Sequence, residues 1–240
     1  MLSSTELKAQ GSVRDSSLFM TLVSASYAYQ VPGGDMAERF GANSNMGISV
    51  LVKRPSNWLF GFEGSFIFGN KVHEPDLGHG LINSDGTITD KFGAPAEILL
   101  FERGWTTTFV VGKMINSVGP NPNSGILIKL GIGYMQHKIR IEHQNNELPQ
   151  LEGDYAKGYD RLTGGLLITQ FLGYQHLSNS RFANFYFGFE FMQGFTSNLR
   201  SYNFDTRQRD DGARLDFLTG FRIGWTLPIY KRQPADLYIY

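Results

Sequence analysis

Apolar and polar residues alternate along most of this chain with a period of two, which is the period of a β-strand. The alternation is clearest in NFYFGFEFMQGF, residues 184–195. The odd positions there carry the phenylalanines Phe185, Phe187, Phe189, Phe191 and Phe195. The even positions include Glu190 and two glycines. This pattern predicts a strand with one apolar face and one polar face.

Seven further segments are predicted as strands on the same grounds, although the alternation in 105–115 is weaker than in the others. They are 16–32, 44–53, 58–69, 105–115, 125–138, 162–177 and 214–230. Segment 162–177 is apolar on both sides, so the pattern does not assign its faces. Most of these segments exceed the about 5–6 residues usual in soluble sheets. They reach the about 9–11 residues that a tilted strand needs to cross a bilayer.

The connections between these strands alternate regularly in length. The short connections are 54–57, 117–124 and 178–183, and they are rich in Pro, Asn, Ser and Gly, as tight turns require. The long connections are 32–43, 71–104, 143–161 and 196–213. Outer-membrane barrels have short turns at the periplasmic end and long external loops. The sequence therefore predicts an all-β fold, a closed antiparallel up-and-down transmembrane β-barrel over residues 10–231.

Eight strands are predicted, but the longest connection leaves the count open. Its segment AEILLFERG, residues 96–104, is itself strand-like. It either adds a hairpin, which would make ten strands, or extends the fourth strand above the membrane.

The two faces of the predicted strands have different roles. The apolar face is expected to contact lipid through Phe60, Phe62, Phe66, Phe185, Phe187, Phe189, Phe191, Phe221 and Trp225. The polar face directs six charged side chains inward, namely Lys53, Glu63, Lys129, Glu190, Asp216 and Arg222. An eight-stranded barrel has an interior that side chains just fill, and unpaired buried charges are costly. We therefore expect a lumen plugged by ion pairs; a gated ion path or a polar site is the alternative.

Composition narrows the classes of function. Basic and acidic residues balance at 22 each, so the basic field of a nucleic-acid binder is missing. Cysteine is absent, which excludes disulfides, thiolate metal sites and a cysteine nucleophile. His73 and His79 lack a third ligand, and residues 83–90 lack the glutamate that closes a calcium loop, so no metal and no cofactor are predicted. Residues 1–9 are interpreted as the remnant of a signal peptide or a disordered tail, and 232–240 as a C-terminal tail.

From Gln10 onward the chain resembles the small eight-stranded barrels of Gram-negative outer membranes, the OmpA and OmpX type. Its final strand also carries the spacing of the signal that the barrel-assembly machinery reads in such proteins, at Arg222, Gly224, Leu227 and Ile229. Residues 231–240 extend beyond that strand, whereas the signal commonly ends the chain. The resemblance implies an outer-membrane location. It also implies contact with membrane lipid and lipopolysaccharide, with the assembly machinery and with other envelope proteins.

One motif suggests catalysis. The spacing of His176 and Ser178 resembles that of the lipid A 3-O-deacylases, in which the histidine is the base and the serine the nucleophile. Carried over, a downstream glutamate, Glu190, would orient the histidine. However, the predicted topology places Ser178 in a periplasmic turn, whereas lipid A lies in the outer leaflet. No catalytic residue is therefore predicted.

The sequence favours a non-enzymatic barrel that is a structural or accessory component of a cell-envelope complex. A lipid A-modifying enzyme and a narrow channel are the alternatives.

Overall fold

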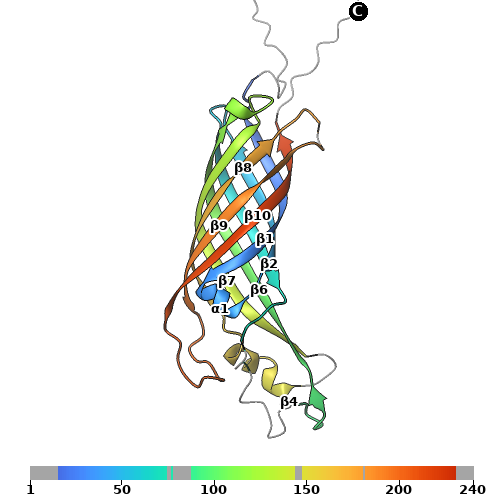
Figure 1. Cartoon of the computed structure of the whole chain (residues 1–240), viewed down its shortest axis with the longest axis vertical. Helices are drawn as coiled ribbons and strands as arrows, with labels where there is room; N and C mark the ends of the chain where they lie inside the picture. Colours follow the sequence, from blue (N-terminus) through green and yellow to red (C-terminus); the bar gives the residue numbers. More distant parts are fainter. Residues whose placement is uncertain (1–15, 75–76, 78–87, 144–147, 181, 231–240) are drawn as a thin grey trace, which may run out of the picture.

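The structure is a computed structural model that describes residues 16–74, 77, 88–143, 148–180 and 182–230. Within these residues, eight antiparallel strands pair edge to edge and close into one barrel (Figure 1). The predicted fold class and the smaller strand count are thus confirmed. No helix in the described part of the chain is long and apolar enough to span a membrane. Residues 1–15 and 231–240, and with them both predicted terminal segments, lie outside the described residues.

The barrel strands follow one another around the ring in the order β1, β2, β3, β6, β7, β8, β9, β10. Their bounds are β1 Met20–Gly34, β2 Asn43–Lys53, β3 Trp58–Gly69, β6 Ile98–Ile115, β7 Gly125–His143, β8 Thr163–His176, β9 Phe185–Asn198 and β10 Ala213–Ile229. The ring closes between β1 and β10, where the register runs from Thr21 opposite Ile229 to Gly34 opposite Asp216. Closure leaves no unpaired strand edge within the hydrocarbon.

Short elements lie between the strands. The helix α1, Asp35–Arg39, connects β1 to β2. The strands β4, Ile88–Thr89, and β5, Pro95–Ala96, form a separate small hairpin. The remaining elements are the 3-10 turns η2 Asn116–Val118, η3 Pro149–Leu151 and η4 Tyr155–Gly158.

The two ends of the barrel differ. We call the end that carries the short turns the turn end; it lies at the top of Figure 1. The loop end lies opposite and carries α1, β4 and the long connections (Figure 1). Segment 96–104 mostly belongs to β6, which is 18 residues long and pairs with β7 up to His143 opposite Ile98. It extends the fourth barrel strand rather than adding a pair to the barrel.

Strand alternation places apolar residues both outside and inside the barrel. At the turn end, a buried cluster fills the lumen; it comprises Met20, Leu22, Leu51, Leu59, Val110, Met114, Leu127, Phe171, Leu177 and Tyr186. At the loop end, a second cluster fills it; it comprises Met36, Phe40, Ile67, Met135, Ile139, Leu167, Met192 and Leu218. We call these the turn-end layer and the loop-end layer. Polar side chains occupy the lumen between them.

This layering resolves the faces of segment 162–177. In β8, Leu167 and Phe171 point inward and belong to the loop-end and turn-end layers, respectively. The alternate residues Leu166 and Leu172 are exposed on the outer wall. The strand is apolar on both sides because one face forms part of the exposed outer wall and the other contributes to the two inner layers.

Candidate functional site

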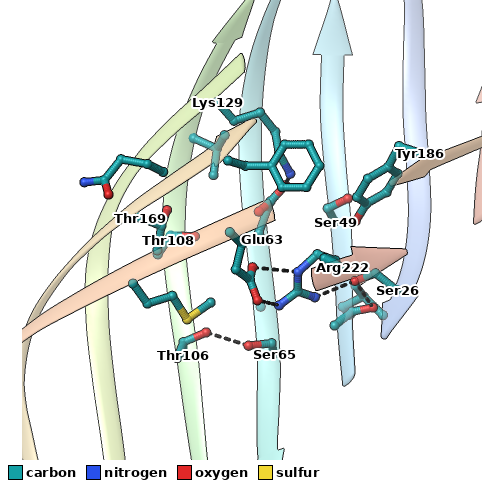
Figure 2. Close-up of a pocket in the computed structure, with 18 residues that line it drawn as sticks. Ser26, Ser49, Glu63, Ser65, Thr106, Thr108, Lys129, Thr169, Tyr186 and Arg222 are labelled. Atoms are coloured by element: carbon teal, nitrogen blue, oxygen red, sulfur yellow. Dashed lines mark hydrogen bonds and ion pairs between the residues drawn. The ribbon is translucent and has the colours of Figure 1, made fainter. Parts of the chain in front are cut away.

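Arg222 on β10 is the centre of the polar middle of the lumen (Figure 2). Its Nε and Nη2 donate to the two carboxylate oxygens of Glu190 at 2.7 and 2.8 Å, which is a bidentate ion pair. Its remaining bonds go to Asn45 Oδ1 at 2.8 Å and to Ser26 Oγ at 2.7 Å. Gly47 leaves room for the guanidinium, since a Cβ there would lie 3.0 Å from Nη1. The guanidinium is therefore held by side chains from three other strands, β1, β2 and β9.

A second ion pair lies beside the first. Lys129 Nζ donates to Glu63 Oε1 at 2.6 Å. The same ammonium lies 4.6 Å from the ring centroid of Phe171 and 5.1 Å from that of Tyr186. These aromatic faces stabilise the cation where water is scarce. Lys129 is thus fixed between the polar middle and the turn-end layer.

The space left between these side chains is small. Hydroxyls line it, and Ser65 and Thr106 hydrogen-bond each other at 2.7 Å (Figure 2). The cavity measures about 30 Å³. Because one water needs about 10–15 Å³ by this measure, the cavity holds about two water molecules. Such a cavity can hydrate the ion pairs.

Asp216 belongs to a separate buried cluster near the loop end. Its Oδ2 is 2.9 Å from His137 Nε2 and accepts a hydrogen bond from Thr196 Oγ1 at 2.6 Å. Arg39 enters this cluster from α1, with Nη2 3.6 Å from Asp216 Oδ1 and Nη1 donating to Thr163 Oγ1 at 3.1 Å. The cluster joins the first long connection to the barrel wall.

Lys53 differs from its prediction as part of an ion-pair network. Its side chain is fully buried, as an inward position requires, but its partners in the described chain are neutral. Nζ donates to Asn123 Oδ1 at 2.8 Å, to Ser17 Oγ at 3.0 Å and to the Leu18 carbonyl at 3.3 Å. Lys53 lies at the turn-end terminus of its strand, whereas the inward acids lie further along the barrel. The parity of a position along its strand (odd or even) predicts whether the side chain points into the lumen. It does not predict how far along the barrel axis that side chain lies.

The sequence reasoning missed Arg39 and did not pair His137. Arg39 is in a long connection, where alternation gives no signal, and only the fold of α1 brings it over the lumen. His137 stands at an inward position by parity, but its partner Asp216 is 79 residues away in the sequence. Asn45 and Gln30 stand at inward positions by parity, and Gln30 Nε2 donates to Glu190 Oε1 at 2.7 Å. Parity could have found both amides.

The structure separates the residues of the deacylase-like motif. His176 stacks on Phe185 with ring centroids 5.1 Å apart, on the outer wall. Ser178 lies in the following turn and accepts a hydrogen bond from the Ser180 amide. Glu190 faces the lumen and pairs in register with Phe171, five residues from His176, or about 16 Å along the strand. The three side chains cannot form a catalytic triad in this arrangement.

The outer wall carries the predicted lipid-facing set. Eight of its members are exposed, from Phe187 at 41% to Phe62 at 65%, and Phe60 is half-buried beside Trp58 and Arg54. Of the four residues with the assembly-signal spacing, Leu227 and Ile229 are exposed on this wall. Arg222 and Gly224 face inward, and a Cβ at Gly224 would lie 2.3 Å from the Tyr186 ring. The packing of Tyr186 therefore requires that glycine.

Ion pairs tie the long connections together at the loop end. Arg161 Nη2 contacts Glu74 at 3.3 Å and Asp205 at 2.7 Å, which joins three connections. Arg200 binds both carboxylate oxygens of Asp160, at 2.9 and 2.5 Å. These bonds raise the pKa of Arg200. Burial raises the pKa of Glu74, although Arg161 opposes the shift.

An apolar cluster supports these ion pairs. It is formed by Leu148, Leu151 and Tyr159, with Ile88, Ala96, Ile98 and Ile141 packed against it. The Tyr159 ring also meets Phe204 edge to face at 5.7 Å. We call the described part of these connections, residues 70–74, 88–97, 148–162 and 199–212, the loop cap. Within the described residues, neither the cap nor the lumen contains a cluster of three metal-ligating side chains.

Among the comparisons with known proteins, only the search of solved structures found similar chains. Neither a scan against protein-family models nor a search of curated proteins found a match. The outer membrane protein OprG of Pseudomonas aeruginosa is 10% identical, with 88% of this chain and 97% of that chain covered and a TM-score of 0.43. Ail of Yersinia pestis, solved with the heparin analogue sucrose octasulfate, is 13% identical over 87% of this chain and 99% of that chain, with a TM-score of 0.40. Neisserial surface protein A is 8% identical over 85% and 96%, respectively, with a TM-score of 0.39.

At these TM-scores, the similarity to the solved structures does not support any conclusion about the function of this chain. The assignment of the fold rests on the closed ring of strands and on the exposed apolar residues that surround it. This is the architecture of the small outer-membrane barrels, and it confirms the predicted fold and location.

Proposed function

We propose that this chain is a non-enzymatic outer-membrane barrel whose lumen does not conduct and which serves as a structural or accessory component of a cell-envelope complex. The filling of the lumen carries the proposal. Two apolar layers and the ion pairs between them leave a cavity of only about 30 Å³. An ion that crossed the barrel would have to pass both layers without water.

Planar-bilayer recording tests the closed lumen. The purified barrel, inserted from detergent, is expected to show no steady conductance, while a general porin inserted in the same way provides the positive control. Insertion is verified by the shift in gel mobility between heated and unheated samples. Steady conductance from correctly folded barrels would contradict the proposal.

The loop cap supports the accessory role. Its connections are held by Arg161, by Arg200 and by an apolar cluster, so the cap presents a largely preformed surface outside the membrane. A rigid surface binds a partner with less loss of conformational entropy than loose loops do.

Co-purification from mild detergent extracts tests this role. A specific envelope protein is expected to accompany the tagged chain. The matched variant Arg161→Met removes the ion pairs that join the connections of the cap. It should recover less of that protein from equal amounts of folded barrel. Recovery of the tagged chain alone, or equal recovery with both chains, would contradict the role of the cap.

Contact with lipopolysaccharide is part of the proposal. Arg103 on β6 lies opposite Lys138 on β7, and Phe101 lies opposite Arg140. These cations face outward next to Trp105 and Tyr134, whose rings are 5.4 Å apart. Aromatic residues mark the interface of a membrane barrel, so the cations lie at the level of anionic headgroups.

Replacement of Lys138 and Arg140 with Gln should lower the amount of co-purified lipopolysaccharide per barrel. The change of Arg54, an exposed residue at the turn end, to Gln provides the control. Equal lipopolysaccharide on both variants would contradict the assignment.

The deacylase alternative loses its structural support, because His176 and Glu190 lie on opposite faces of the wall. Mass spectrometry of lipid A from cells that carry Ser178→Ala is expected to show the wild-type profile. A change in lipid A confined to that variant would support the deacylase alternative.

A further inference from the structure

Two glutamines interrupt the apolar outer wall of β8 and β9. Gln193 Nε2 donates to Gln170 Oε1 at 3.4 Å. Both side chains face outward, because their neighbours Phe171 and Met192 are buried in the lumen. Exposed apolar residues surround the pair along both strands: Leu166, Leu172, Phe191 and Phe195.

The pair lies at membrane depth. Gln170 is six residues from the end of β8 at His176 and seven from its start at Thr163. With about 3.3 Å per residue and a tilt of about 40°, Gln170 stands about 15 Å above the turn end of its strand. The apolar belt of such barrels is about 25 Å tall, so the amides lie inside it rather than at its border.

These amides are left incompletely hydrogen-bonded. A glutamine amide offers two N–H donors and a carbonyl that accepts. Among the described residues, the bond between Gln170 and Gln193 is the only one that either side chain makes. Gln170 Nε2 and Gln193 Oε1 therefore face hydrocarbon, where an unsatisfied polar group is costly. A partner that supplies both a donor and an acceptor at this depth would remove that cost.

We propose that the wall of β8 and β9 is the contact surface of a two-fold dimer of this chain. Two copies inserted in the same direction are related by an axis along the membrane normal, which keeps every residue at its own depth. Such a contact is isologous, so the amide pair of one copy meets that of the other. The amide is self-complementary because it carries both donors and an acceptor. Leu172 and Phe191 flank the pair and pack around it.

Cross-linking tests the surface directly, because the chain contains no cysteine. Leu172→Cys places a thiol on β8 beside Gln170. The matched control, Ile48→Cys, places one on β2, the strand across the ring from β8. Both parent residues are exposed, at 54% and 71%, respectively. In native membranes, a short bis-maleimide should link Leu172→Cys into a species of twice the chain mass and leave Ile48→Cys monomeric.

A second variant links the dimer to the amides. Gln170→Leu with Gln193→Leu, in the Leu172→Cys background, should abolish most of the cross-link. In detergent, the dissociation constant of the dimer should rise about tenfold, as expected for the loss of a few hydrogen bonds in an apolar medium. Thr107→Val, another change from polar to apolar on the outer wall, should leave both readouts unchanged. Heat-modifiable mobility shows that each variant is folded.

The proposal is overturned if a folded Leu172→Cys stays monomeric, if a dimer forms equally through Ile48→Cys, or if the cross-link survives the loss of both amides. A cross-link to a different protein in place of the dimer overturns it as well.

Discussion

The ion pair between Arg222 and Glu190 allows a quantitative test of the closed lumen. Arg222→Met keeps much of the side-chain volume and removes four hydrogen bonds. It leaves the Glu190 carboxylate buried with Gln30 as its remaining partner, at 2.7 Å. Removal of one partner of a buried ion pair costs about 3–5 kcal/mol, because the other charge stays uncompensated. We expect the free energy of unfolding to fall by this amount.

A double-mutant cycle isolates the pair. Glu190→Gln combined with Arg222→Met removes both charges, so the double variant should be less destabilised than the sum of the two single changes. The expected coupling is about 2 kcal/mol, within the range for neighbouring charged groups. Arg54→Met, at an exposed turn position, controls for the loss of a positive charge.

The assay is reversible unfolding in urea, with the barrel in lipid vesicles. Fluorescence of Trp58, Trp105 and Trp225 on the outer wall reports the transition. A cost below about 1 kcal/mol for Arg222→Met, the usual value of a solvent-exposed pair, would refute the reasoning. It would mean that bulk water reaches the guanidinium and that the lumen is open.

Three further outcomes are expected. The double variant Glu190→Ala with Arg222→Ala should show no conductance in planar bilayers, because the apolar layers on either side of the ion pair still exclude water. Steady conductance would show that the ion pairs alone keep the lumen closed. Arg161→Met should raise proteolytic cleavage within 148–162 at least severalfold while the barrel stays folded, and unchanged cleavage would show that the loop cap does not depend on this residue. Burial opposes ionisation of Asp210, but Arg214 outweighs it and lowers the pKa of that carboxyl. The stabilisation is thus present above the ordinary pKa of about 3.9 and is lost as pH falls through the lowered value. Hydrogen exchange over 199–213 should show this loss, and Asp210→Asn should remove the dependence on pH.

Much of the fold was predictable because a barrel strand has one repeating signal. Each residue of NFYFGFEFMQGF faces the outer wall or the lumen according to its parity, and β9 follows that parity throughout. The lengths of the connections distinguished the two ends. Segment 96–104 was the exception, since its pattern suited both a hairpin and an extension. Its pairing with β7 decided between them.

The candidate site was predicted in part. Parity placed Lys53, Glu63 and Arg222 inside the barrel, but it could not say which acid lies near which base. Partners come from strands distant in sequence, and their relative heights depend on the stagger of the register around the ring. Lys53 shows the consequence, because it meets Asn123 at the turn end rather than a carboxylate.

By itself, the sequence determined the architecture, since an alternating pattern of this length can bury its polar face only by closing a ring. Tertiary structure decided what fills that ring. Closure of the ring brings together the side chains of the two apolar layers. It also brings Arg222 to its hydrogen-bond partners and Arg39 to Asp216. The outer wall also depends on contacts between strands, because Gln170 and Gln193 become neighbours only through the pairing of β8 with β9. Periodicity is local along one strand, whereas these contacts depend on the stagger between strands.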